Sequence, residues 1–514
     1  MWKFAIIPLL SILALWTWQF FNWVWLKPRK TEKFFRNQGM KGNSYRFLLG
    51  DSKETSRMYE KAYSKPIGLN DDIVPRVMPN IVDTIKKYGN YSFTWLGPRP
   101  RVFVLDPDII KEVLGNYRKF TKPFNTSNPI VKMLVTGLIN MEGDEWAKSR
   151  SKLNPTFYLD NLKPMVPAIK VCCENTIEAW REKTSKGGGS SVVDAYPYLE
   201  VFTGSVLAQL MFSSAYTEQI KTTFLQLSEL ALLGRLSTHI FPIPGERYFP
   251  TQKNRRAKEI DKFVRVTFTS MINERLEKRK SGSDSCKLDL LDMFMEELYW
   301  TKDRDRERII EDVIGQCKIF FFAGYETSSN LLCWTMVMLS LHQDWQIRAR
   351  EEVLQVLCNK KEITFDDLSK LKIVTMILNE MLRLYPPTME FSRVVGEETK
   401  IGKYIIPKDT MVTCPILILH RSTEIWGKDA GEFRPERFAE GVAKAAKSEA
   451  AYMPFGWGPR ICIAQNFGIL ETKTFLAILL RNFSFEISPS YAHAPFVDVT
   501  LRPQYGAPLV LREL

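Results

Sequence analysis

The segment that most constrains this chain is a glycine-rich loop that carries a single cysteine. The loop spans residues 454–464, reads PFGWGPRICIA and places Cys462 near its end. Apolar residues then recur at helical spacing, at Phe467, Leu470 and Ile478, which predicts a helix directly after the loop. A thiol at a helix start meets the positive end of the helix dipole and unpaired N–H groups, which favour the thiolate. The loop therefore predicts a thiolate that ligates a metal.

The other cysteines show no metal-site or disulfide pattern. The chain has eight cysteines, at positions 172, 173, 286, 317, 333, 358, 414 and 462. They lack the short paired spacings of a zinc site and the density of a secreted disulfide scaffold, so reduced thiols on the cytosolic side fit best. Most of them, such as Cys333, are expected to be small buried hydrophobes, and a structural role of this kind is the alternative for Cys462.

The chain is basic, with a formal net charge of +13 at pH 7. A basic surface can meet nucleic acid, a membrane or an acidic protein, although each basic run taken alone is most simply a solvated helix face or loop. No helix-turn-helix, zinc-finger spacing or aromatic RNA motif accompanies these runs. We therefore expect no nucleic-acid partner.

The first residues predict a membrane anchor. Residues 4–26 are almost wholly apolar, which is long enough for a helix to cross the hydrocarbon core. The segment ends in Trp23 and Trp25 followed by basic residues, unlike a signal cleavage site, and the positive-inside tendency places the body in the cytosol. The predicted organisation is an uncleaved anchor at 1–26, a basic linker at 27–50 and one large domain at 51–514.

The pattern beyond the linker is mixed. Alternating apolar residues predict two short strands within 92–105, and residues 483–514 predict further short strands. The apolar run 307–341 is long enough for a second membrane helix, but Lys318 within it favours a buried core helix. The run 187–189 lacks the ending of a phosphate loop and predicts a surface turn. The expected fold is one mainly helical domain with small sheets (α+β).

Three further motifs belong to helices. Residues 323–328 lie in the long helix, where Gly324 costs about 1 kcal/mol relative to alanine and so indicates that something approaches the backbone. Glu380 and Arg383 are three residues apart, and residues 146 and 150 are a Trp and an Arg four apart, so each pair shares a helical face. Taken alone, such pairs are usually modest surface contacts or core residues.

Together these motifs resemble the cytochrome P450 superfamily. Phe455, Gly458, Arg460 and Cys462 match its Phe-x-x-Gly-x-Arg-x-Cys haem loop, with Ala464 where glycine is usual. The resemblance runs from the anchor to the end of the chain. It implies the cytochrome P450 fold, a haem b cofactor and Cys462 as the ligand of its iron, whose thiolate favours cleavage of the O–O bond.

The resemblance also implies a role for the long helix. Thr327 and Glu326 would be the catalytic pair that binds dioxygen at the haem and delivers protons to it. Ala323 and Gly324 would leave room for dioxygen beside them.

The remaining motifs are implied to hold the haem and the structure around it. The cofactor-binding residues by resemblance are Trp146, Arg150, Ala323, Gly324, Arg393, Phe455, Gly458, Arg460 and Cys462. Among them Trp146, Arg150, Arg393 and Arg460 would contact the haem propionates. Residues 435–438 resemble a companion motif in which Arg437 completes a buried structural charge network with Glu380 and Arg383.

At finer grain the chain is similar to plant cytochrome P450 family 72. The match lies in residues 27–28, 42–46 and 455–460, and residues 485–495 are similar to members that oxidise iridoid monoterpenoids. Departures such as residues 388–392 and 420–422 bear on the substrate and not on the chemistry.

The resemblance implies a monooxygenase of the endoplasmic reticulum membrane, with its catalytic domain in the cytosol. Electrons would come from NADPH through NADPH-cytochrome P450 reductase. The substrate would be a small lipophilic or glycosylated terpenoid, best an iridoid of the deoxyloganic acid or loganin type, with triterpenoids or gibberellins as alternatives. A cysteine-ligated haem is also compatible with a dehydratase or isomerase, which would not need the proton-delivering pair, and with a haem-binding sensor or carrier without turnover.

Overall fold

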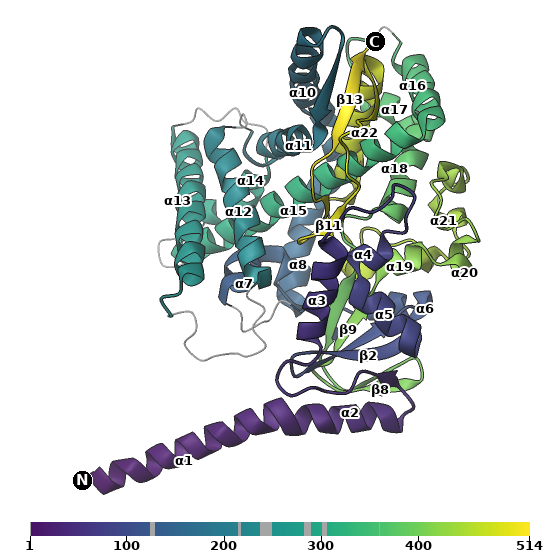
Figure 1. The fold of residues 1–514 in the computed structure, drawn as a ribbon. Coiled ribbons are helices and arrows are strands. Elements are labelled where there is room, and N and C mark those ends of the chain that lie inside the picture. The colour runs from purple at the N-terminus through teal and green to yellow at the C-terminus, as the bar shows by residue number, and fades with distance from the viewer. Residues whose placement is uncertain are drawn as a thin grey trace.

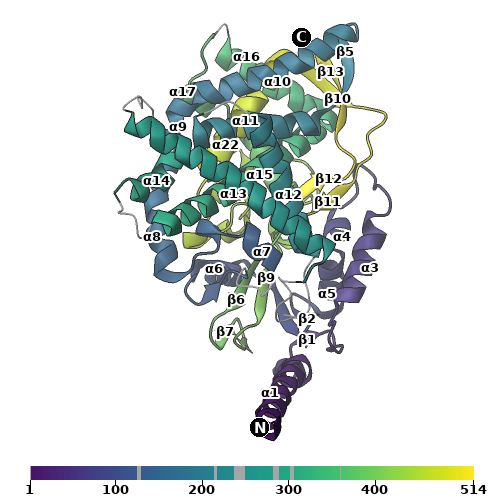
Figure 2. The same cartoon turned by 90° about the vertical axis from the view of Figure 1, so that its left-hand side faces the viewer.

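Helices make up most of the chain, and the strands form small sheets (Figures 1 and 2). The computed structural model describes residues 2–123, 129–213, 217–236, 249–281, 289–300, 306–358 and 360–514. The expected fold class, mainly helical with small sheets, is confirmed.

The N-terminal segment is one continuous helix that lies below the rest of the chain in Figure 1. It consists of α1 (Trp2–Phe21), a π-helical turn η1 (Asn22–Leu26) and α2 (Lys27–Asn37). Among the described residues, no helix is both long enough and apolar enough to cross a membrane. The division of the chain at residues 26 and 50 stays a prediction, and the helix continues through the first of these positions.

This helix is packed against the body at its second half. Val24 and Phe35 are buried, and Tyr45 Oη donates to the carbonyl of Val24 at 2.5 Å. Gln38 Nε2 donates to the carbonyl of Ile405 at 3.0 Å, and Gln38 Oε1 accepts from the Ile405 N–H at 2.7 Å. These contacts fix the direction in which the helix leaves the body.

The largest sheet lies next to α2. Within the described chain it has six strands, in the order β1 (Lys41–Gly42), β2 (Tyr91–Leu96), β3 (Arg99–Val104), β9 (Met411–Cys414), β6 (Phe391–Val395) and β4 (Phe120–Thr121). Strands β2 and β3 form an antiparallel hairpin in which Tyr91 is opposite Val104. The two strands expected within 92–105 are therefore confirmed.

The C-terminal strands form smaller sheets, as the sequence predicts. These sheets pair β10 (Phe483–Ile487) and β5 (Ser190–Asp194) with β13 (Pro508–Glu513), β11 (Pro495–Val497) with β12 (Leu501–Pro503), and β7 (Thr399–Ile401) with β8 (Tyr404–Ile406). The glycine run 187–189 is a turn between α10 (Val166–Lys186) and β5, which confirms the expected surface turn.

The remaining helices either precede or follow the long helix α15 (Arg306–Leu341) in the chain. Those that precede it are α3 (Ser52–Tyr63), α4 (Val74–Val77), α5 (Pro79–Tyr88), α6 (Pro107–Gly115), α7 (Pro129–Leu134), α8 (Gly143–Leu153), α9 (Leu159–Leu162), α11 (Ala195–Phe212), α12 (Glu218–Leu236), α13 (Gln252–Lys280) and α14 (Leu290–Trp300). Those that follow it are α16 (Gln343–Leu357), α17 (Phe365–Ser369), α18 (Lys372–Leu384), α19 (Ile416–His420), α20 (Thr423–Trp426), α21 (Val442–Ala445) and α22 (Gln465–Asn482).

The long apolar run of the sequence is the central helix α15 (Arg306–Leu341), which crosses the middle of the molecule in Figure 1. Its buried residues extend from Val313 to Ser340. Lys318 is only 1% exposed, and its ammonium is paired with Asp261 on α13 and donates to the carbonyl of Met133. Because a buried charge requires partners of this kind, the lysine is compatible with a core position, and the expected buried helix is confirmed.

The cysteines other than Cys462 are mostly buried, as expected. Cys172, Cys173, Cys317, Cys333 and Cys414 are buried free thiols, whereas Cys358 is exposed. Cys286 lies outside the described residues.

Candidate functional site

The cysteine loop is closed by its own backbone. The N–H of Cys462 donates to the carbonyl of Phe455 at 2.9 Å, and the N–H of Ile461 donates to the carbonyl of Gly458 at 3.0 Å. Gly458 has a φ of +71°, and a Cβ on it would lie 2.8 Å from the Cα of Gly115 on α6. Only glycine satisfies both conditions. The loop leads directly into α22, the helix that the sequence predicts there.

Cys462 lines a cavity of about 300 Å³. The expected site residues that also line it are Trp146, Arg150, Ala323, Gly324, Thr327, Phe455 and Arg460. Three others, Glu326, Arg393 and Gly458, are not part of its lining. Most of the remaining wall is apolar, with Leu207, Leu210, Phe320, Leu331 and Phe391 among its residues.

The thiol of Cys462 is under opposing influences. The side chain is exposed to the cavity, but its position inside the protein raises its pKa, whereas the backbone N–H of Ala464 and the charges of Arg150 and Lys122 lower it. Desolvation is the largest of these effects, so a further positive partner would favour the thiolate. A metal cation bound to the sulfur supplies that charge.

Cations gather beside the loop. Arg150 donates to the carbonyl of Ile461 at 2.8 Å, and Arg460 stacks over the ring of Trp146 at 4.3 Å. Arg460 Nη2 is paired with Glu142, whereas its Nη1 is buried without a hydrogen-bond partner among the described residues. Burial lowers the pKa of Arg150, of Arg460 and of nearby Arg393. This region therefore has positive charge in excess and suits an anionic ligand.

Lys122 is a member of this group that sequence reasoning missed. It lines the cavity, and burial, followed by repulsion from Arg393 and Arg460, lowers its pKa to about 7. Its backbone N–H donates to Glu142 at 2.9 Å, so Glu142 connects it to Arg460. The chain has 71 lysines and arginines, and no local pattern distinguishes this lysine from the rest.

The segment 323–328 of α15 presents different residues to different neighbours. Ala323, Gly324 and Thr327 line the cavity, and Thr327 Oγ1 donates to the carbonyl of Ala323 at 2.7 Å. A Cβ on Gly324 would lie 2.8 Å from the side chain of Leu207 on α11. The glycine thus also permits close packing of α11 on α15, a reason that the sequence did not indicate.

Glu326 points away from the cavity. It is 5% exposed, and it accepts a hydrogen bond from Thr500 Oγ1 at 2.7 Å, beside β12. Thr500 in turn accepts from Asn330 at 2.7 Å. Burial raises the pKa of Glu326. The structure places the hydroxyl of Thr327 on the cavity wall and the carboxyl of Glu326 behind it, so the predicted pair is adjacent in sequence but faces two environments.

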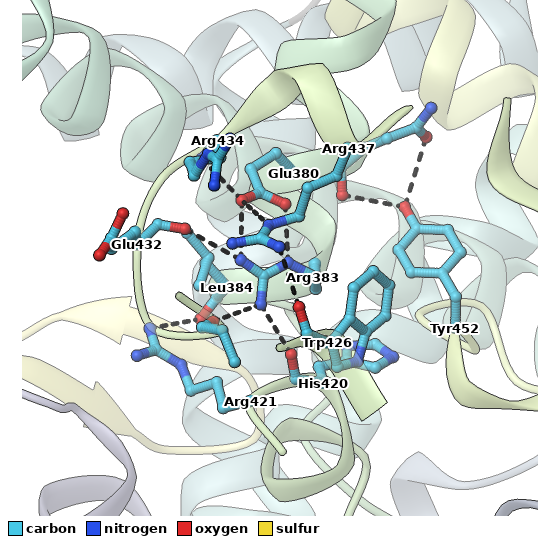
Figure 3. Close-up of polar contacts among 12 residues, drawn as sticks. Glu380, Arg383, Leu384, His420, Arg421, Trp426, Glu432, Arg434, Arg437 and Tyr452 are labelled. Carbon is cyan, nitrogen blue, oxygen red and sulfur yellow. Dashed lines mark hydrogen bonds and ion pairs between the residues drawn. The ribbon is translucent and has the colours of Figure 1, made fainter. Parts of the chain in front are cut away.

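Glu380, Arg383 and Arg437 lie together in a buried network (Figure 3). Arg383 donates from Nε and Nη2 to the two carboxylate oxygens of Glu380, both at 2.7 Å, and both side chains have no exposed surface. Arg437 Nε lies 3.5 Å from Glu380 Oε1. The network is adjacent to the cavity but contributes none of its charged lining.

The network is connected to the cysteine loop through His420. Arg383 Nη1 donates to the carbonyl of His420 at 2.8 Å, and the ring Nε2 of His420 accepts from the N–H of Met453 at 3.1 Å. Met453 directly precedes the loop. Tyr452 adds a second connection, because its hydroxyl donates to the carbonyl of Asn379 on α18 at 3.0 Å.

A second missed residue is Glu471 on α22. It has no exposed surface, and neither carboxyl oxygen makes a well-formed hydrogen bond to the described residues. Burial raises its pKa to about 8, with the hydroxyl of Ser328 lowering it in part. Ser328 lines the cavity, so this protonated carboxyl lies just behind the cavity wall.

Comparison with known proteins identifies the family. A family model described as Cytochrome P450 matches residues 74–504. Cytochrome P450 CYP72A219 of Panax ginseng is 48% identical over 98% of this chain and 97% of its own length. The 7-deoxyloganic acid hydroxylase and secologanin synthase 2 of Catharanthus roseus are each 44% identical over 98% of this chain, and over 97% and 96% of their own lengths.

The chain belongs to the cytochrome P450 family. The predicted resemblance to plant family 72 is confirmed, and its relatives include secologanin synthase and 7-deoxyloganic acid hydroxylase. Membership makes this cytochrome P450 a monooxygenase with a haem iron cofactor.

The residues around the cavity fit a haem. Cys462 would provide the sulfur ligand, and the apolar walls suit the macrocycle. The excess cations Lys122, Arg150 and Arg460, with an unpartnered N–H group on Arg460, suit two propionates.

The buried charge network yields a prediction for stability. Replacing Glu380→Gln leaves Arg383 and Arg437 without their shared carboxylate in a site that excludes water. We expect the free energy of unfolding to fall by about 3–5 kcal/mol, the usual cost of removing one partner of a buried pair. Urea unfolding of the purified protein measures the loss.

The control is Glu178→Gln, because Glu178 and Arg181 have the same spacing but are exposed. At this site the free energy of unfolding should change by at most about 1 kcal/mol. Equal losses in the two variants would contradict the prediction.

Glu471 yields a prediction for pH dependence. Between its ordinary pKa of 4.5 and the value of about 8 in the folded protein, the folded chain retains a proton that the unfolded chain has lost. Stability contributed by this group therefore falls as pH rises through that window. We expect Glu471→Gln to remove this decline, so that the variant gains stability relative to the wild type from pH 5 to pH 8. Denaturant unfolding at several pH values, with the exposed control Glu440→Gln, measures it. A constant difference between variant and wild type would refute the assignment.

Proposed function

We propose that this cytochrome P450 hydroxylates or oxidises a plant terpenoid, with an iridoid of the deoxyloganic acid or loganin type as the best candidate. The observation that supports this proposal is a mostly apolar cavity with the Cys462 thiol and the Thr327 hydroxyl on its wall. The names of the Catharanthus roseus relatives support the iridoid class. Triterpenoids and gibberellins are the alternatives within the family.

The haem supplies the activation of dioxygen, and the chain supplies binding, orientation and proton control. Cys462 holds the iron, and Lys122, Arg150 and Arg460 hold the propionates. Apolar residues such as Leu210, Phe320 and Leu331 exclude water and position the hydrocarbon part of the substrate. Thr327 holds a proton at its Oγ1 on the cavity wall.

Two buried carboxyls behind the wall of the cavity could take part in proton delivery, those of Glu326 and Glu471. Burial raises the pKa of both Glu326 and Glu471, so each retains a proton more readily than an exposed glutamate. Glu326 is next to Thr327 in the chain, and Glu471 lies near Ser328. We assign the delivery of protons to Glu326 and Thr327 together. The hydrogen bond from Thr500 holds Glu326 in place.

Electrons come from NADPH through NADPH-cytochrome P450 reductase in this proposal. The positive net charge of the chain suits an acidic redox partner. Residues 1–26 hold the enzyme at the endoplasmic reticulum membrane, with residues 51–514 as the catalytic domain in the cytosol. The apolar sequence of α1 and its tryptophans support this placement.

The substrate class is tested with a panel of compounds. Microsomes that contain this enzyme and its reductase are incubated with NADPH and with iridoids, triterpenoids or gibberellins, and products are identified by mass spectrometry. We expect an iridoid to gain one oxygen atom, and the Cys462→Ala variant to give no product and no thiolate-type spectrum of its reduced carbon monoxide complex. Oxidation of a triterpenoid or gibberellin instead would overturn the substrate proposal. NADPH-independent conversion would favour a dehydratase or isomerase.

The role of Thr327 is tested by the ratio of product formed to NADPH consumed. Thr327→Ala should leave haem content unchanged, because the cysteine loop and its cations are untouched. Without the hydroxyl, protons arrive in the wrong order, so reduced oxygen leaves as hydrogen peroxide and the ratio falls. Thr327→Ser should retain more product, because it keeps the donor while losing the methyl group that fixes the rotamer. Equal ratios in all three proteins would remove the assignment for Thr327 and Glu326.

A further inference from the structure

A second cavity, of about 420 Å³, lies between the N-terminal helix and the edge of the six-stranded sheet. Trp23, Lys27 and Thr31 line it from the helix, four residues apart and so on one face. The sheet side contributes Arg99, the first residue of β3, and Lys408, in the turn before β9. The cavity thus exists only because α2 is docked against the body.

The lining of this cavity has more cations than anions. Lys27 is paired with Asp409 at 3.1 Å. Arg99 and Lys408 are exposed, and in the part of the chain that the structure describes neither side chain has an ion pair or a hydrogen bond. Thr410 lines the same cavity without exposed surface, and its hydroxyl has no partner among these residues. Two cations and a hydroxyl that lack partners are the groups that an oxyanion would satisfy.

The position of the cavity indicates where that oxyanion comes from. The helix that forms one wall continues into the apolar α1, and Trp16, Trp18, Trp23 and Trp25 cluster at the end of this apolar run. Trp16 and Trp18 are exposed. Tryptophans gather at the level of lipid headgroups, so a helix inserted up to this cluster brings the cavity to that level.

We propose that the cavity bounded by Trp23, Lys27, Arg99 and Lys408 binds the phosphate of an anionic membrane lipid. The proposal rests on the membrane association proposed above. Arg99 and Lys408 donate to the phosphate oxygens, while Lys27 stays with Asp409 and offsets the one carboxylate of the lining. A lipid held here joins the bilayer to both α2 and the sheet, so it fixes the orientation of the catalytic body and not only its presence at the membrane.

The test uses the purified full-length protein in detergent and calorimetric titration with water-soluble ligands. The probes are dihexanoyl phosphatidic acid, dihexanoyl phosphatidylcholine and inorganic phosphate. We expect the phosphatidic acid to bind, the zwitterionic lipid not to bind, and inorganic phosphate to bind more weakly because it lacks the contact with Trp23. The double variant Arg99→Gln/Lys408→Gln should weaken binding of phosphatidic acid by about tenfold or more, since it removes two charge-assisted contacts. Lys122 is left unchanged because it lines both cavities.

The matched control is Lys30→Gln/Lys33→Gln, which removes the same charge from exposed positions of α2 outside the cavity. This control should bind phosphatidic acid like the wild type. Equal weakening in the two double variants would show general attraction to a basic helix and overturn the site. Equal binding of inorganic phosphate and phosphatidic acid would show a free phosphate site and overturn the lipid assignment. Failure of the membrane proposal appears separately, as a full-length chain that does not associate with phosphatidylcholine vesicles.

Discussion

The buried guanidinium of Arg383 is the interaction on which the position of the cysteine loop depends. A charge without exposed surface is costly unless its partners satisfy it, and here Glu380 neutralises it while the carbonyls of His420 and Glu432 accept from it. These acceptors belong to the chain that precedes the loop. Because Arg383 is on α18, the helix and this chain segment are held at one separation, and the loop begins from a fixed point.

His420 transmits this constraint, and its chemistry makes the connection insensitive to pH. Burial, followed by the charge of Arg383, lowers the pKa of His420 to about 3. The ring is therefore neutral at physiological pH, and its Nε2 can accept from the N–H of Met453. A protonated ring would have no acceptor there. Burial, with a smaller contribution from the cation that organises the carbonyls, thus keeps the histidine in the form that holds the loop.

The parts of the fold and of the site that the sequence predicts are those that depend on the spacing of neighbouring residues in the chain. The cysteine loop and its helix, the buried helix α15 and the pairing of Glu380 with Arg383 all depend on residues close together in the chain. What the sequence could not indicate depends on distant neighbours. The direction of Glu326 is set by Thr500, and part of the reason for Gly324 is Leu207. No rule of spacing relates residues more than one hundred positions apart.

Lys122 is another residue that the sequence could not indicate. It also shows how the site keeps positive and negative charges apart. The charged groups that shift the pKa of Cys462 are the cations Arg150 and Lys122, which favour the thiolate. The buried carboxyl of Glu471, behind the cavity, has a pKa raised to about 8. An ionised carboxylate near the sulfur would favour the neutral thiol, since like charges disfavour ionisation. Burial therefore favours the neutral form of Glu471 behind the cavity wall, so that the side chains whose charges act on the sulfur are the two cations.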